Sequence, residues 1–181
     1  WVKTTMTTAL TATGIDGAAN SATTCTAAGA SSKIIQTVTQ GATADTVSFF
    51  IRRRTGTGTI EITPDNTAFT DITAALAAAA SATAGGWYRA TVSATLTNPA
   101  FGVRITTDTD AVDVDFAQLE AGTSATSPIL TTTASVARAA DVVRTVGLPP
   151  FGLTGSLFAI GTPTRPTAAA LNQRLAGLRT N

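Results

Sequence analysis

The sequence predicts an all-β protein, an antiparallel β-sandwich of the jelly-roll type with a short C-terminal extension. Three observations predict this class. Short segments that alternate apolar with polar residues recur along the chain, and Gly, Pro, Asn or Asp bound most of them. No convincing amphipathic helix lies between these segments. Thr, which suits strands, and Ala together make up about two residues in five.

The first half of the chain contains the clearest strand signals. Residues 46–53 and 58–63 both alternate, and the Arg54-Thr55-Gly56-Thr57 segment between them has the composition of a hairpin turn. We therefore predict that these two strands pair with each other. The strands predicted in this half cover residues 1–13, 22–27, 33–39, 46–53, 58–63 and 69–72.

The second half begins with an Ala-rich segment at residues 74–84. Ala is the best helix former, but Leu76 is the only large apolar residue there, and isolated helices of about 11 residues are marginal. We therefore expect a loop with a single helical turn. Three further strands are predicted over residues 87–97, 101–107 and 111–119.

The character of the chain changes towards its C-terminus. We predict a jelly-roll domain over residues 1–146, and over residues 147–181 a linker and either the start of a second domain or a tail for assembly contacts. A strand over 156–160 and a short amphipathic helix over 168–178 are expected within this extension. So short an extension cannot bury a core of its own, so it must pack on something else. We interpret the whole sequence as part of a longer polypeptide.

Charge and residue types exclude several classes of function. The 181 residues include 12 Lys and Arg against 11 Asp and Glu, a formal net charge of +1, with no His and one Cys. A general nucleic-acid binder carries a basic excess, so we expect no nucleic-acid partner. Without His there is no His-dependent triad and no His-ligated zinc site. No stretch approaches the about 20 apolar residues of a spanning helix, so we expect no membrane insertion.

A cluster of aspartates is the most suggestive group of ionisable residues. Their carboxylates could bind a structural Ca²⁺, which prefers oxygen ligands. The alternative that we favour is a solvated strand face, with Asp113 and Asp115 opposite the apolar Val112 and Val114, because no Asp-x-Asp-x-Asp-Gly loop is present. The four residues of the cluster are Asp108, Asp110, Asp113 and Asp115.

Arginines and aromatic residues are the candidates for ligand contacts. The Arg52-Arg53-Arg54 run could meet phosphate or acidic sugar, but a strand end with Arg52 and Arg54 solvated is the favoured interpretation. Trp87 and Tyr88 are adjacent and point to opposite faces of a strand, so we expect Trp87 in the core and Tyr88 in a more open position. Trp1 is expected either to pack on a preceding domain or to stack on a ligand. Cys25 is expected to be a small buried residue.

Four short motifs follow one another in the second half of the chain. They are Gly-Trp-Tyr-Arg-Ala-Thr-Val at 86–92, Val-Asp-Val-Asp-Phe-Ala-Gln-Leu-Glu-Ala-Gly at 112–122, Ala-Thr-Ser-Pro-Ile-Leu-Thr-Thr at 125–132 and Val-Ala-Arg-Ala-Ala-Asp at 136–141. Together they resemble the carbohydrate-binding-module-like jelly rolls of phage virion proteins, of the tail-fibre, baseplate and spike type. The third motif departs from the family's Tyr-Ile-Pro-Thr, because this chain has Pro-Ile-Leu-Thr at 128–131.

The resemblance implies a structural protein of the phage virion, assembled in the host cytoplasm. Its expected partners are other virion subunits, identical copies in a homo-oligomer with a trimer favoured, and polysaccharide of the host surface. The alternatives are a capsid decoration protein without a receptor role and, less favoured, a glycan-degrading enzyme domain. No Ser or Thr cluster has a partner base, so we expect no catalytic residues. No cofactor is expected apart from the calcium considered above.

The residues that would carry these roles fall into two groups. Candidate glycan contacts are Trp1, Arg52, Arg54 and Tyr88. The residues expected to maintain the motif structure are Trp87, Arg89, Gln118 and Glu120. A surface rich in Ala and Thr also favours association, because few charged groups lose water when it is buried against a copy of itself.

Overall fold

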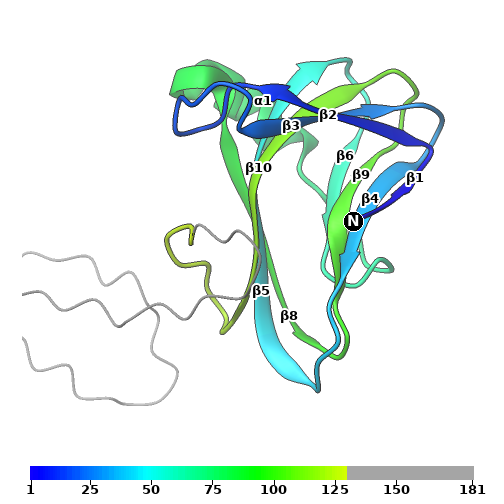
Figure 1. The fold of residues 1–181 in the computed structure, drawn as a ribbon, viewed down its shortest axis with the longest axis vertical. Helices are drawn as coiled ribbons and strands as arrows, with labels where there is room; N and C mark the ends of the chain where they lie inside the picture. Colours follow the sequence, from blue (N-terminus) through cyan, green and yellow to red (C-terminus); the bar gives the residue numbers. More distant parts are fainter. Residues whose placement is uncertain (130–181) are drawn as a thin grey trace, which may run out of the picture. The chain divides into compact units, whose positions relative to one another are not determined.

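The computed structural model describes residues 1–129 and shows two five-stranded antiparallel sheets packed face to face (Figure 1). This arrangement confirms the predicted antiparallel β-sandwich. The predicted boundary after residue 146, the extension 147–181 with its expected strand and helix, and the motif at 136–141 lie outside the described residues. Within residues 1–129, no helix has the length and apolar character needed to cross a bilayer.

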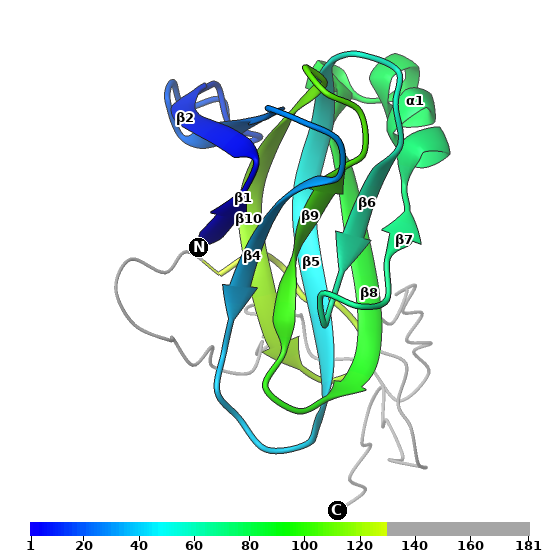
Figure 2. The same cartoon turned by 90° about the vertical axis from the view of Figure 1, so that its right-hand side faces the viewer.

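The chain distributes its strands between the two sheets in an interleaved order. Sheet 1 contains, from edge to edge, β1 (Val2–Thr4), β4 (Ser32–Thr37), β9 (Ala100–Ile105), β6 (Ile60–Thr63) and β7 (Thr70–Asp71). Sheet 2 contains β2 (Met6–Ala12), β3 (Ala22–Ala27), β10 (Ala111–Ala121), β5 (Thr43–Thr55) and β8 (Tyr88–Leu96). Consecutive strands β1 and β2 therefore form edges of different sheets, and both lie on the same side of the sandwich (Figure 2).

The first predicted strand, residues 1–13, is in fact two strands. The chain breaks at Thr5, whose φ of 48° lies in the left-handed region, and it passes there from β1 in sheet 1 to β2 in sheet 2. The Thr5 carbonyl oxygen accepts hydrogen bonds from the Ser32 hydroxyl and from the Ala28 N–H, the latter at 2.8 Å. Because these contacts come from residues distant in the sequence, the alternating pattern runs through Thr5 and does not indicate that the strand breaks there.

The predicted hairpin between β5 and β6 is wrong, because these strands belong to different sheets. The segment between them crosses from sheet 2 to sheet 1 and is held by Asp110, whose carboxylate accepts the Gly58 N–H at 2.7 Å. Gly56 has a φ of +84°, which glycine adopts at little cost. Turn composition predicts a change of direction but not which sheet the next strand joins.

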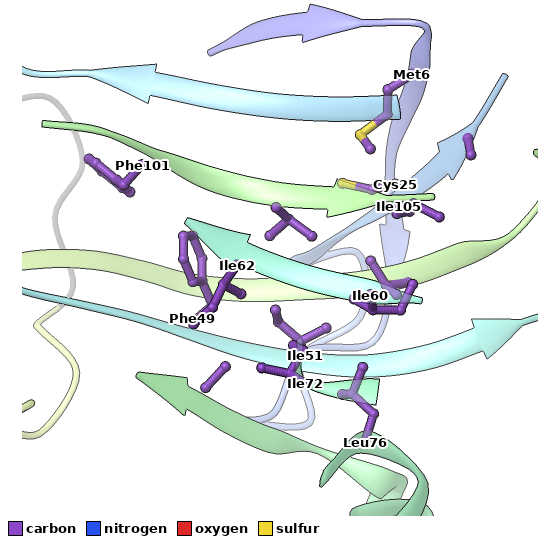
Figure 3. Close-up of a cluster of buried hydrophobic side chains, with 14 of the residues drawn as sticks. Met6, Cys25, Phe49, Ile51, Ile60, Ile62, Ile72, Leu76, Phe101 and Ile105 are labelled. Atoms are coloured by element: carbon purple, nitrogen blue, oxygen red, sulfur yellow. The ribbon is translucent and has the colours of Figure 1, made fainter. Parts of the chain in front are cut away.

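The main core lies between the sheets and is built by alternate residues of their central strands. Figure 3 shows side chains from both sheets converging, with Phe49 and Ile51 of β5 facing Ile60 and Ile62 of β6. These four side chains are completely buried. Burying side chains of this size contributes about 1.5–3 kcal/mol each to folding, so the interface between the sheets is the main source of stability.

The Ala-rich segment forms a regular helix, α1 (Thr73–Ala82), followed by a 3-10 turn, η1 (Ala84–Gly86). The expectation of a loop with one helical turn is therefore wrong. The helix lies at the upper end of the sandwich in Figure 2, where Leu76 and Ala79 are buried. The Asp71 carboxylate also accepts the Thr73 N–H at 2.8 Å at the start of the helix. Packing on the sandwich supplies the stability that an isolated Ala-rich helix lacks.

Replacing Leu76 by Ala should lower the free energy of unfolding by about 2–5 kcal/mol, because it removes the side chain that anchors the helix and leaves a cavity. An Ala78→Gly change on the exposed side of the same helix should cost only about 1 kcal/mol, the difference in helix propensity. Urea denaturation measures both. Equal losses for the two variants would show that Leu76 does not anchor α1 to the sandwich.

Candidate functional site

A buried ion pair occupies the outer face of sheet 2. Asp113 of β10 is only 1% exposed, and its carboxylate accepts the Arg52 Nε–H at 2.9 Å and the Thr24 hydroxyl at 2.6 Å. The guanidinium of Arg54 lies 3.5 Å from the same carboxylate. The expectation of a solvated Asp113 is therefore wrong. Because β10 lies between β3 and β5, the strand register places Asp113 directly between Thr24 and Arg52.

The same arginine contacts Trp87. The Arg52 guanidinium lies over the indole at 4.6 Å from the ring centroid, and it donates to the Thr13 carbonyl at 3.2 Å. Trp87 is buried, as expected, but in a small cluster with Ala12 and Ala22 that is separate from the main core. Tyr88, which we expected in a more open position, packs half-buried against the main core. The adjacent aromatics thus occupy two different apolar clusters, one on each face of sheet 2.

The other aspartates of the cluster have separate partners. Asp110 is buried and lies 3.3 Å from the Arg53 guanidinium. Asp108 accepts the Thr109 N–H at 2.9 Å, and Asp115 accepts the N–H groups of Ile15 and Phe116. In the part of the chain that the structure describes, no three acidic, Cys or His side chains are grouped to hold a metal ion. The geometry therefore offers no support for calcium at these aspartates.

The motif residues Arg89, Gln118 and Glu120 hold the segment that follows β10 against the outer face of sheet 2. The Glu120 carboxylate accepts the Thr126 N–H at 2.7 Å and the Thr126 hydroxyl at 2.6 Å. Gln118 accepts the Ile129 N–H at 2.9 Å, and Arg89 donates to the Thr126 carbonyl. Three side chains from two of the four motifs thus fix the path of residues 122–129.

A cavity of about 210 Å³ lies between the two sheets beside the N-terminal strand. Its lining contains both apolar and polar residues. Trp1, which is 54% exposed, and the exposed Ala117 mark its mouth. The residues that line the cavity are Trp1, Ser21, Thr23, Cys25, Ile34, Phe49, Val103, Val114, Asp115, Phe116 and Ala117.

Two local features shape this cavity. The Trp1 ring packs edge-on against Phe101, with ring centroids 5.5 Å apart. The Phe101 ring in turn packs against Phe49, with ring centroids 6.1 Å apart. On the opposite wall β10 bulges, because its register with β5 shifts between Asp115 and Gln118 and Phe116 adopts a φ of 44°. The bulge interrupts the regular layer of inward-facing side chains beside the cavity.

The four candidate glycan contacts do not come together. Trp1 lines the cavity, whereas Arg52 and Arg54 pair with Asp113 on the outer face of sheet 2 and Tyr88 packs against the main core. The sequence interpretation missed the polar lining residues Ser21 and Thr23, since nothing in or next to a Thr-rich strand distinguishes them. Comparison with protein-family models, with curated proteins and with solved structures gives no match. The resemblance to phage modules therefore stays a prediction.

Replacing Asp113 by Ala should cost about 3 kcal/mol of unfolding free energy, because it leaves the partly buried Arg52 without its counter-charge. Asp108→Ala, at an exposed position in the same cluster, should cost less than about 1 kcal/mol. Thermal and urea unfolding of the two variants measure the difference. A small effect at both positions would contradict the central role of the ion pair.

Burial, followed by the nearby charge of Asp113, raises the pKa of the Cys25 thiol from 9.0 to about 12. Iodoacetamide at pH 9 should therefore label the urea-unfolded chain readily and the folded chain at least about a hundred times more slowly, since only the thiolate reacts. Because the folded-state pKa is the higher one, this group's contribution to stability is full below pH 9 and falls as the pH rises towards 12. Equal labelling rates in the two states would contradict the burial of the thiol.

Proposed function

We propose that this chain is a structural protein of a phage virion, a tail-fibre, baseplate or spike module that assembles with identical copies and other virion subunits and contacts polysaccharide on the host surface. The observation that carries the proposal is the role of Arg89, Gln118 and Glu120. These residues belong to the motifs on which the resemblance rests, and in this fold they hold residues 122–129 on the sandwich. Side chains of the first two motifs thus bind backbone groups of the third.

The distribution of exposed apolar side chains supports assembly with identical copies. The large exposed hydrophobic residues of the described chain lie on or next to the edge strands β1 and β2; they are Trp1, Val2, Leu10 and Ile15. Val2 is 69% and Leu10 is 59% exposed. Within residues 1–129, each of these strands pairs with a neighbour on one side only, and an edge of this kind can form backbone hydrogen bonds with another chain. One side of the sandwich thus combines exposed apolar area with free backbone groups.

The cavity beside Trp1 supports attachment to a polysaccharide. Sugars are recognised by aromatic surfaces combined with a few polar groups, and the lining of this cavity includes the aromatic Trp1 and the polar residues Ser21 and Thr23. The arginine run contributes to the fold instead, since Arg52, Arg53 and Arg54 all pair with buried aspartates.

Sedimentation at micromolar concentration should show an oligomer of the full chain. Val2→Lys should shift this oligomer towards monomer by placing a charge on edge strand β1, whereas Thr91→Lys, which adds the same charge at an exposed position of β8 away from the apolar side chains, should leave it assembled. A wild-type monomer would contradict assembly. An oligomer that binds none of an array of bacterial surface polysaccharides would overturn the attachment role and favour capsid decoration.

A further inference from the structure

Strand β2 forms an edge of sheet 2 and lacks the features that usually keep edge strands from pairing with other chains. Such features include charged side chains, Pro and very short length. β2 (Met6–Ala12) has seven residues, none of them charged and none of them Pro. Within residues 1–129, β3 is its only neighbour in the sheet (Figure 1). Its outer edge is therefore suited to pair with a strand of another molecule.

The other three edge strands are less suited to such pairing. β1 has three residues, one of which is Lys3, and β7 has two, one of which is Asp71. β8 is longer, but it contains Arg89. Among the large exposed hydrophobic residues of the described chain, none lies on β8, whereas Leu10 of β2 is 59% exposed. Covering such a side chain is favourable, because it removes apolar surface from water.

A second copy of this chain is the partner that fits the β2 edge. The exposed side chains of β2 are all uncharged, so an identical strand meets no like charge there and a charged peptide finds no counter-charge. They are Thr7, Ala9, Leu10 and Thr11. Lys3 of β1 donates from Nζ to the Thr8 hydroxyl at 3.4 Å, but its exposed side chain can turn towards solvent. Val2 of β1, on the same side of the sandwich, adds exposed apolar surface (Figure 2).

We propose that β2 pairs with β2 of a second copy in an antiparallel arrangement about a two-fold axis, so that the two copies of sheet 2 become one continuous sheet. Opposite residues of an antiparallel pair point to the same face, and consecutive residues of a strand point to opposite faces. Two-fold symmetry therefore places one residue of β2 directly opposite its own counterpart. This inference rests on the proposed assembly of identical copies, and it makes a two-fold pair the basic unit, not the trimer expected from the resemblance.

The pairing of β2 with β3 indicates which residue lies at the axis. This pairing is regular from Met6 to Leu10 and its register shifts after Leu10, so Thr8 is the centre of the regular stretch. An arrangement centred on Thr8 places Leu10 opposite Met6 of the second copy, and Thr7 opposite Ala9 of the second copy. The first of these is an apolar cross-strand pair, which stabilises a sheet. Both copies of the exposed Leu10 are covered in this arrangement.

The test is disulfide cross-linking of the full chain in a Cys25→Ala background, because Cys25 of β3 lies opposite Thr8 and would capture a new thiol there. Thr8→Cys should give a covalent dimer under mild oxidation. Opposite Cα atoms of an antiparallel pair lie about 4.5–5.5 Å apart, which is within the range of a disulfide. Thr7→Cys and Ala9→Cys should not cross-link alone but should cross-link with each other when mixed, since they lie opposite one another.

Leu10→Ala gives a second measurement. Leu10 is exposed in a single copy, so this change should leave urea unfolding nearly unchanged. It should weaken the dimer about tenfold in sedimentation, because less apolar surface is buried on association.

Thr91→Cys is the matched control for cross-linking. It changes an exposed Thr on the edge strand β8, so it should give no covalent dimer. Equal cross-linking of Thr91→Cys and Thr8→Cys would overturn the inference. An oligomer that lacks β2 cross-links would overturn the inference but not the proposed assembly, whereas a monomer would overturn both. A β2-linked dimer that binds no bacterial surface polysaccharide would support the inference and overturn only the attachment role.

Discussion

The buried carboxylate of Asp113 is the interaction on which the organisation of sheet 2 depends. A charge with 1% exposure persists in a folded protein only when it is paired and hydrogen-bonded, and Arg52 and Thr24 meet that requirement from the two neighbouring strands. The same arginine covers Trp87 and reaches the loop after β2. One ion pair thus joins three strands, an aromatic cluster and a loop on the outer face.

The bulge in β10 changes which face of sheet 2 the following residues occupy. Before the bulge, β10 presents Val112 to the main core and Asp113 to the outer face; after it, Gln118 and Glu120 return to the outer face opposite Ser48 and Thr46. These two side chains then hold residues 122–129. At the bulge itself, the side chains of β10 no longer alternate regularly between the two faces, and this part of the strand borders the cavity. The candidate binding site and the structural role of the motifs thus both follow from this irregularity.

The alternation of side chains predicted most strands and the interior of the sandwich, because burial on one face imposes a period of two along each strand. Residues 87–97 and 111–119 correspond closely to β8 and β10. The candidate site was much less predictable. Trp1 was identified as a candidate, but its neighbours Thr23 and Asp115 come from strands distant in the sequence, and the arginines expected near a ligand neutralise buried aspartates instead.

The sequence by itself determined that this chain forms an antiparallel β-sandwich, since the strand pattern is a local property of consecutive residues. Tertiary structure alone decided which sheet each strand joins, that residues 73–82 become a helix, and that Asp113 is buried. Each of these outcomes depends on partners far along the chain: Asp110 beside Gly58, the core beneath Leu76, and Arg52 beside Asp113. Local patterning carries no information about such partners, because strand register and sheet packing bring them together only in the folded molecule.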